Sequence, residues 1–268
     1  MKKIAVIGVG NMAKAIINGI VSSDEINIER FYLFDKFRDA CSQFEGNARF
    51  EIVDDISSAV EKADCVLLSV KPQNFPEVLE QIQKVLGHSE KLYITIAAGI
   101  TVQSVSEKLG NAVVVRVLPN LPMTIGMGVS AICKNDRVSQ RDFDFVKSVF
   151  RSSGSITVID ESEMNRIIGV TSSSPAYVFK FIDAICKGAV AQGLDGEELL
   201  NAVCDVVIGS AVLLKGAEDS PSQLISKVAS KGGTTERALL KLNESNFDKV
   251  IEDAMIACTE RADELGKQ

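Results

Sequence analysis

The residues best placed to do chemistry lie near the amino terminus, where residues 8 to 13 read GVGNMA. This matches the pattern G-x-G-x-x-G/A, which follows a strand and opens a helix in dinucleotide-binding folds. Gly8 permits a tight turn, Gly10 lets the backbone approach a pyrophosphate, and Ala13 lets the helix pack closely on the sheet. The helix N-terminus then offers N–H groups and a positive dipole end to the phosphates. An ordinary tight turn is the alternative, but in this context we predict dinucleotide contacts from Gly8, Gly10, Asn11 and Met12.

The end of the next expected strand bears on which dinucleotide binds. Asp35 lies where an acidic residue hydrogen-bonds the ribose 2′-hydroxyl of NAD and repels the 2′-phosphate of NADP. Lys36 and Arg38 follow at once, and both can reach that phosphate. They can equally be solvated charges on a loop. Two cations outweigh one anion if both point inward, so NADPH is the favoured cofactor and NADH the alternative.

The number and spacing of histidine and cysteine residues limit the reactions and metal sites that the protein can have. The single histidine, His88, is expected in a surface turn after a helix. Most hydroxy-acid dehydrogenases need a general base, commonly His or Lys, whereas a C=N carbon is already electrophilic and its nitrogen needs at most one proton from a modest donor. A site without histidine therefore favours imine reduction. The six cysteines are far apart and form no C-x-x-C pair, so we expect reduced core thiols and no metal site.

Composition limits the class of protein. A length of 268 residues, 46% hydrophobic, predicts a globular chain with a dinucleotide-sized domain and a second domain. A net charge of -7 without a Lys/Arg block argues against nucleic acid. Gly8 and Gly10 cut the first apolar run too early for a signal peptide, and no run approaches the roughly 18 consecutive apolar residues that span a bilayer. We expect a cytoplasmic protein with a small-molecule substrate and no membrane partner.

Short β-branched runs alternate with amphipathic stretches up to about residue 159. This alternation predicts an α/β fold, with an N-terminal Rossmann domain built on a doubly wound parallel sheet over residues 1–159. The expected strands are Lys3–Gly8, Phe31–Asp35, Asp64–Val70, Leu92–Ala97, Ala112–Leu118, Val129–Cys133 and Ile156–Ile159.

After Asp160 the β-branched runs give way to long stretches of helical periodicity. This pattern predicts a second, all-helical domain over residues 160–268. The expected helices cover 161–192 with a break or kink at Pro175, then 196–218, and three more that begin at Ser220, after Thr235 and near Asn246. The second is apolar around much of its circumference. Such a helix in a small domain needs another chain to cover it, so we predict a homodimer through this domain, with room for a larger oligomer of dimers.

Five motifs in order resemble the pyrroline-5-carboxylate reductase family over nearly the whole chain. The longest is PSQLISKVASKGGTTERALLKLN at 221–243, built around a Gly-Gly-x-Thr turn that opens a helix. SVKPQ at 69–73, TIAAGI at 95–100 and RVLPNLP at 116–122 are similar to further family elements, in addition to the glycine-rich turn. The resemblance implies reduction of 1-pyrroline-5-carboxylate to L-proline, the last step of proline biosynthesis, with hydride from NAD(P)H.

The resemblance also implies roles for the motif residues. Thr235 would hydrogen-bond the imine nitrogen and donate its proton, unless either threonine of the pair is only an N-cap. The Gly-Gly turn at a helix start suits a substrate carboxylate, which gives the substrate contacts Ser230, Gly232, Gly233, Thr234 and Thr235. The other cofactor contacts leave the carboxyl ends of strands, where open α/β sheets bind ligands; they are Ser69, Val70, Lys71, Pro72, Ala97, Ala98, Gly99 and Asn120.

Several positions depart from the family pattern. Ser172 and Ser174 stand where the family has glycines, Lys231 replaces a proline, and Leu121 replaces a threonine. None of these changes removes a group that the chemistry needs.

Two alternative functions are compatible with parts of the sequence. A β-hydroxyacid dehydrogenase would place a catalytic lysine at Val178, and Lys180 lies about 200° further round the helix. A non-catalytic dinucleotide sensor would keep the fold without turnover. Cofactor oxidation with pyrroline-5-carboxylate distinguishes it from the enzyme.

Overall fold

The chain forms two compact units. The structure, a computed structural model, describes residues 1–85, 90–194 and 197–266, so His88 lies outside the described residues. One unit comprises Met1–Pro175 together with Met255–Gln268, and the other comprises Ala176–Ala254. The functional division at residues 159 and 160 stays a prediction.

An eight-stranded sheet organises the first unit, in the order β3-β2-β1-β4-β5-β6-β7-β8. The first six strands have the order 3-2-1-4-5-6 of a doubly wound sheet, the fold class that the sequence predicted. All neighbouring pairs are parallel except β6 and β7. The strands are β1 Lys2–Ile7, β2 Ile28–Phe34, β3 Phe50–Ile52, β4 Cys65–Leu68, β5 Leu92–Thr95, β6 Val113–Leu118, β7 Gly128–Lys134 and β8 Gly154–Val158.

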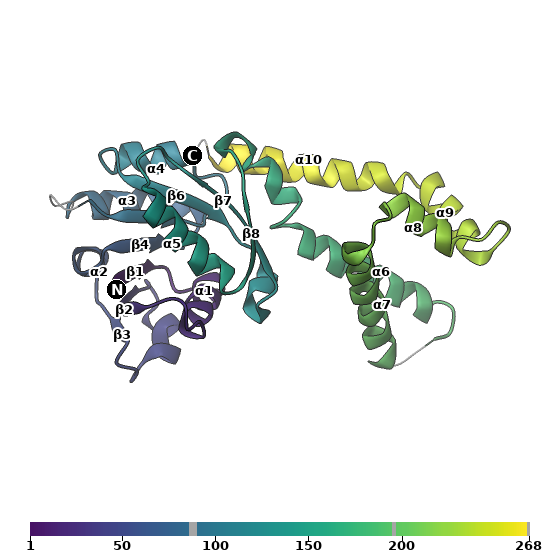
Figure 1. Cartoon of the computed structure of the whole chain (residues 1–268), viewed down its shortest axis with the longest axis horizontal. Coiled ribbons are helices and arrows are strands. Elements are labelled where there is room, and N and C mark those ends of the chain that lie inside the picture. Colours follow the sequence, from purple (N-terminus) through teal and green to yellow (C-terminus); the bar gives the residue numbers. More distant parts are fainter. Residues whose placement is uncertain (86–89, 195–196, 267–268) are drawn as a thin grey trace. The chain divides into compact units, whose positions relative to one another are not determined.

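Two apolar cores cover the two faces of this sheet. Figure 1 shows the sheet and the helices beside it. Helices α1 (Asn11–Val21) and α5 (Gln140–Arg151) pack on one face, and α2 (Ile56–Lys62), α3 (Phe75–Gln83) and α4 (Val102–Lys108) pack on the other. The middle strands β4, β5 and β6 are buried along their whole length, as parallel strands covered on both faces should be. Short 3-10 helices connect the elements: η1 Arg38–Phe44, η2 Pro72–Asn74, η3 Leu121–Ile125, η4 Glu161–Glu163 and η5 Arg166–Gly169.

The carboxyl-terminal helices are α6 (Ser174–Val190), α7 (Glu197–Gly216), α8 (Pro221–Val228), α9 (Thr234–Glu244) and α10 (Phe247–Leu265). The first expected helix, over 161–192 with a break or kink at Pro175, is an α-helix only from Ser174, so the prediction is wrong for the part before the break. Two 3-10 turns occupy its beginning, and Pro175 lies in the first turn of α6, where a missing N–H costs nothing. Ser220 begins α8 as expected, because its hydroxyl accepts the Gln223 N–H while the Gln223 side chain accepts the Ser220 N–H.

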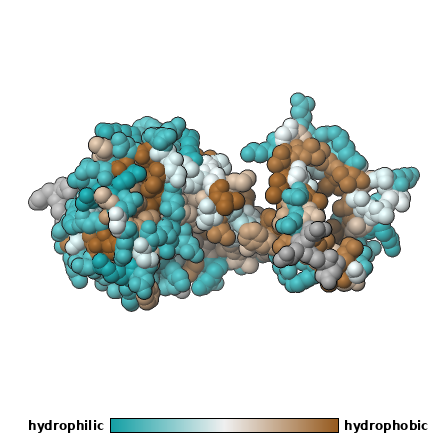
Figure 2. Space-filling view, turned by 90° about the horizontal axis from the view of Figure 1, so that it is seen from below, coloured by the Kyte–Doolittle hydropathy of each residue, from teal (hydrophilic) through white to brown (hydrophobic). Residues whose placement is uncertain are grey.

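Apolar side chains gather on the surface of the Ala176–Ala254 unit (Figure 2). In α7, Val206, Val212 and Leu213 are more than 60% exposed. The segment Leu199–Gly216 is long and apolar enough to cross a membrane by length and composition alone, with 6% of it buried. That criterion does not separate a membrane span from a helix covered by another protein chain.

Candidate active site

The glycine-rich turn adopts the conformation that the chemistry requires. Gly8 has φ +91°, and a Cβ atom there would lie 2.8 Å from the Ser69 carbonyl oxygen. Gly10 is extended at the N-cap of α1, and a Cβ atom on it would meet nothing within 4 Å. The first turn of α1 carries no acidic residue. The turn therefore presents an open, uncharged backbone and a helix N-terminus to an anion.

Asp35 braces this turn from the end of β2. Its Oδ2 accepts the Val9 N–H at 2.7 Å, and its Oδ1 accepts the Phe37 N–H at 2.9 Å. Both carboxylate oxygens are thus bonded to the backbone on the two sides of the site. Sequence reasoning assigned this residue to the ribose alone and missed the brace.

A groove of about 550 Å³ opens beside Asp35 and brings together many predicted cofactor contacts. Arg38 forms an exposed ion pair with Asp54 at 2.8 Å. Pro72 begins η2 just past β4, and Asn11, which is exposed, lies on a second groove along α1. Met12 packs against the core. The predicted residues on the first groove are Gly8, Gly10, Asp35, Lys36, Ser69, Val70 and Lys71.

The loop after β5 holds Ala97, Ala98 and Gly99. The Ala97 N–H donates to Thr95 Oγ1 at 3.3 Å. Gly99 has φ +79°, and a Cβ atom there would lie 2.5 Å from the carbonyl oxygen of Ala262 in α10. Only glycine fits between this loop and α10 without a backbone shift.

Asn120 is buried after β6, and both ends of its amide are bonded within the protein. Its Oδ1 accepts the Val129 N–H at 2.9 Å, and its Nδ2 donates to the Thr171 carbonyl oxygen at 3.0 Å. The side chain therefore fixes the start of η3. A cofactor contact from Asn120 stays a prediction.

The predicted substrate residues form the turn before α9, in the Ala176–Ala254 unit. Gly232 has φ +75°, and its N–H donates to Glu236 Oε2 at 2.7 Å, while the Gly233 N–H donates to the Ser230 carbonyl oxygen at 2.9 Å. The N-cap of α9 is Gly233 and not a threonine. Among the described residues, no hydrogen-bond acceptor faces the N–H groups of Thr234 and Thr235.

Arg116 lies within the motif at 116–122, and it is not available to a substrate. Its side chain is 1% exposed and is paired with Glu161 at 2.9 Å. The sequence signal was an arginine inside an otherwise apolar strand, VVVRVL. Its partner lies 45 residues away, and no pattern in the sequence pointed to it.

No group of three or more His, Cys, Asp and Glu side chains is arranged to hold a metal among the described residues. Cys41, Cys65 and Cys133 are buried free thiols, as expected for core residues, whereas Cys186, Cys204 and Cys258 are only partly buried. Burial raises the pKa of the Cys65 thiol to about 12, which keeps it protonated and unreactive.

The doubly wound sheet, the open glycine turn and the groove beside it define an NAD(P)-dependent oxidoreductase with a helical carboxyl-terminal region. Residues 161–265 match the family model described as pyrroline-5-carboxylate reductase dimerisation. Residues 3–99 match the model described as NADP oxidoreductase, coenzyme F420-dependent.

Full-length relatives agree with these matches. The chain is 31% identical to pyrroline-5-carboxylate reductase of Escherichia coli strain K12, over 99% of both chains. It is 35% identical to that of Vibrio alginolyticus, over 99% of this chain and 98% of the other. The crystal structure of Plasmodium falciparum pyrroline carboxylate reductase with NADP bound is 27% identical with a TM-score of 0.89, over 99% of this chain and 98% of that one. The chain belongs to the pyrroline-5-carboxylate reductase family.

Proposed function

We propose that this protein reduces 1-pyrroline-5-carboxylate to L-proline, the last step of proline biosynthesis, with NADPH as the favoured reductant and NADH as the alternative. The observation that carries the proposal is the glycine turn before α9, which leaves backbone N–H groups at a helix N-terminus next to the Thr235 hydroxyl. The family membership of the whole chain supports the same reaction.

The cofactor fits the residues that the fold brings together. The backbone of Gly8 and Gly10 and the start of α1 would hold the pyrophosphate, and Lys36 and Arg38 would neutralise the 2′-phosphate. Arg38 can leave its exposed partner at little cost, because surface ion pairs contribute about 0–1 kcal/mol. When bound, the reduced nicotinamide supplies a hydride. Ser69–Pro72 and Ala97–Gly99 would line the same edge of the sheet, with Asn120 fixing the next loop.

The substrate carboxylate lies at the turn 232–235, where the N–H groups of Thr234 and Thr235 bind it and the Gly232 N–H joins them when Glu236 moves away, with Ser230 beside them. The Thr235 hydroxyl donates a hydrogen bond to the imine nitrogen and then its proton. The C=N carbon gains the hydride and the nitrogen gains the proton, so the product is the secondary amine of proline. No arginine clamp is needed, because helix N–H groups and their dipole stabilise a carboxylate.

Assembly and location complete the proposal. Residues 1–159 bind the dinucleotide, and residues 160–268 form a homodimer and bind the substrate. The exposed apolar side chains of α7 are the surface that a second copy covers, and dimers can associate further. The protein is cytoplasmic and binds neither nucleic acid nor membrane.

The decisive experiment is a steady-state assay of NADPH oxidation with pyrroline-5-carboxylate, with a β-hydroxy acid and NADP in the reverse direction as the comparison. Turnover with the imine alone supports the proposal. Turnover with the hydroxy acid alone would identify a β-hydroxyacid dehydrogenase. NADPH binding without turnover of either would identify a sensor.

A further inference from the structure

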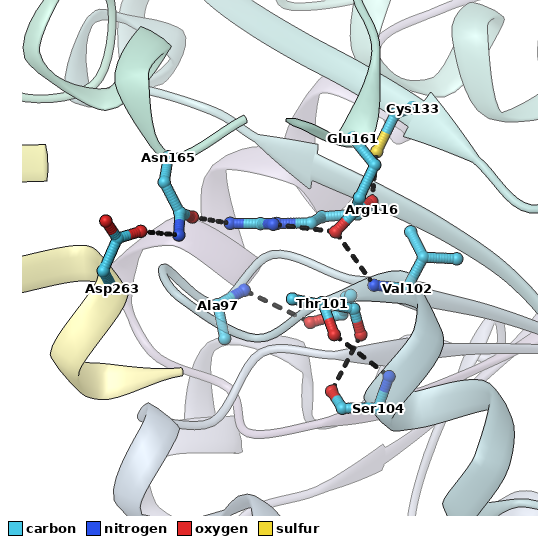
Figure 3. Close-up of polar contacts among 10 residues, drawn as sticks. Ala97, Thr101, Val102, Ser104, Arg116, Cys133, Glu161, Asn165 and Asp263 are labelled. Carbon is cyan, nitrogen blue, oxygen red and sulfur yellow. Dashed lines mark hydrogen bonds and ion pairs between the residues drawn. The ribbon is translucent and has the colours of Figure 1, made fainter. Parts of the chain in front are cut away.

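Three side chains form a row across the sheet beneath the cofactor loop. Thr95 of β5 pairs in register with Arg116 of β6, and Arg116 pairs in register with Cys133 of β7, so the three residues share one face of the sheet. Figure 3 shows Arg116 and Cys133. A fully buried guanidinium in this row requires charged and hydrogen-bonding partners.

Glu161 of η4 provides these partners from above the row. Its Oε1 accepts Arg116 Nη1 at 2.9 Å and the Val102 N–H at 3.1 Å. Its Oε2 accepts the Cys133 thiol at 2.8 Å. Burial and then the hydrogen bond to Glu161 raise the pKa of that thiol, so it remains protonated and is the donor. One carboxylate therefore joins β6, β7 and the start of α4.

The loop Ala97–Thr101 is fixed between two ends of this network. Its first residue donates to Thr95 at 3.3 Å, next to Arg116 in the row. Val102, directly after its last residue, donates to Glu161. Thr101 also caps α4 by accepting the Ser104 N–H at 3.0 Å. The backbone position of the loop thus depends on where Glu161 is held.

The network continues to the last helix. Arg116 Nη2 donates to Asn165 Oδ1 at 2.6 Å, and Asn165 Nδ2 donates to Asp263 Oδ1 of α10 at 2.6 Å (Figure 3). The same end of α10 meets Gly99 through the Ala262 carbonyl oxygen. The loop is held by Glu161 on one side and by α10 on the other.

We propose that Arg116 and Glu161 are positioning residues for the reaction, and that they set the loop Ala97–Thr101 against the nicotinamide through the Val102 N–H. This inference rests on the proposed function, which places the nicotinamide at that loop. Apolar residues of equal volume would stabilise a core at least as well as a buried ion pair. A carboxylate that accepts one particular backbone N–H instead fixes the position of the loop that carries it. That position matters because small misplacements of reacting groups slow catalysis steeply.

A substitution at Val102 can remove the hydrogen bond between the loop and Glu161 while the charges of Arg116 and Glu161 both remain. Val102 is the first residue of α4, and Thr101 before it is extended, so a proline fits at position 102. The proline removes the backbone N–H that donates to Glu161. Val102→Ala is the matched control, because it loses packing but keeps the N–H. Asp142→Asn, which breaks the partly buried ion pair with Lys2 at the opposite end of the sheet, controls for a general loss of stability.

The deciding measurements are hydrogen–deuterium exchange of residues 97–101 in the free and NADPH-bound protein, kcat, and the dissociation constant for NADPH. Relative to Val102→Ala, we expect Val102→Pro to exchange about tenfold faster in this loop and to have a kcat about tenfold lower, as loss of one hydrogen bond to a charged group implies. The dissociation constant should change less than about threefold, since the pyrophosphate turn is intact. Glu161→Ala, which removes the acceptor of the Val102 N–H, should behave as Val102→Pro does. Asp142→Asn should lower only the melting temperature.

Equal loop exchange and equal kcat in the proline and alanine variants would overturn the inference. A proline variant that fails to fold while the alanine variant folds would also overturn it, because the bond would then serve folding. If the wild-type protein does not turn over pyrroline-5-carboxylate, the proposed function fails, yet the exchange comparison still decides whether Glu161 positions the loop.

Discussion

Replacing Asp35 by alanine should weaken both cofactors together and leave the preference between them nearly unchanged. The carboxylate accepts the Val9 N–H at 2.7 Å and the Phe37 N–H at 2.9 Å, so it belongs to the frame of the phosphate turn. Phe37 is 74% exposed, and water can replace the lost acceptor there. Val9 is fully buried, and its N–H would be left without a partner.

The buried N–H sets the size of the effect. An unsatisfied buried donor costs about 1–3 kcal/mol. If that cost falls on the conformation that binds the pyrophosphate, kcat/KM decreases about five- to 150-fold, at 1.4 kcal/mol per factor of ten. NADPH and NADH share the pyrophosphate, so both should fall by similar factors. The ratio of their kcat/KM values should stay within about threefold.

Steady-state kinetics with both cofactors test this reasoning, with the Lys36→Ala/Arg38→Ala double variant as the comparison. That variant leaves the brace intact and should weaken NADPH much more than NADH, because only NADPH offers a 2′-phosphate to the two cations. An Asp35→Ala protein that loses NADH activity while keeping NADPH activity would refute the argument and make Asp35 a ribose ligand.

Four further predictions follow from the site and the assembly. Thr235→Ala should lower kcat about 10–100-fold with little effect on NADPH affinity, whereas Thr235→Ser should retain most turnover; equal rates in wild type and Thr235→Ala would contradict the proton-donor role. Glu236→Ala should lower KM for the substrate several-fold in the same assay, because it removes the side-chain oxygen that accepts the Gly232 N–H at 2.7 Å. Gly99→Ala should lower the free energy of unfolding by at least about 1–2 kcal/mol, measured in urea, since φ is +79° and its Cβ would overlap Ala262. Leu213→Glu should dissociate the dimer in analytical ultracentrifugation while Lys215→Glu does not, and a stable Leu213→Glu dimer would place the interface elsewhere.

The sequence predicted the elements whose periodicity is strong. Seven expected strands correspond to observed ones, and the fully buried strands β4, β5 and β6 among them are mainly apolar runs. The eighth strand, β3, was missed: it is a three-residue edge strand, partly buried, with Glu51 at its centre. The antiparallel pairing of β7 with β6 has no local signature, since strand direction depends on the path of the connecting η3 segment.

Motifs located the candidate site more successfully than they defined its contacts. The glycine turn, the Ser69–Lys71 segment and Asp35 line one groove as their order along the sheet predicted. Three contacts were missed: Asp35 with the Val9 N–H, Glu236 with the Gly232 N–H, and Glu161 with Arg116. They depend on side-chain directions and on segments that are distant in sequence. Hydrophobic period and residue spacing carry no information about either.

The last turn of α10 has a consequence for how the protein is made. Residues of the sheet-containing unit occur at both ends of the chain, since Met255–Gln268 belongs with Met1–Pro175. On the ribosome, where synthesis proceeds at about 5–20 residues per second, the Rossmann sheet emerges long before Ala262 and Asp263. The Gly99 loop and Asn165 therefore remain exposed until Ala262 and Asp263 have been synthesised and can pack on them. A fragment that ends at residue 175 would leave both of them exposed.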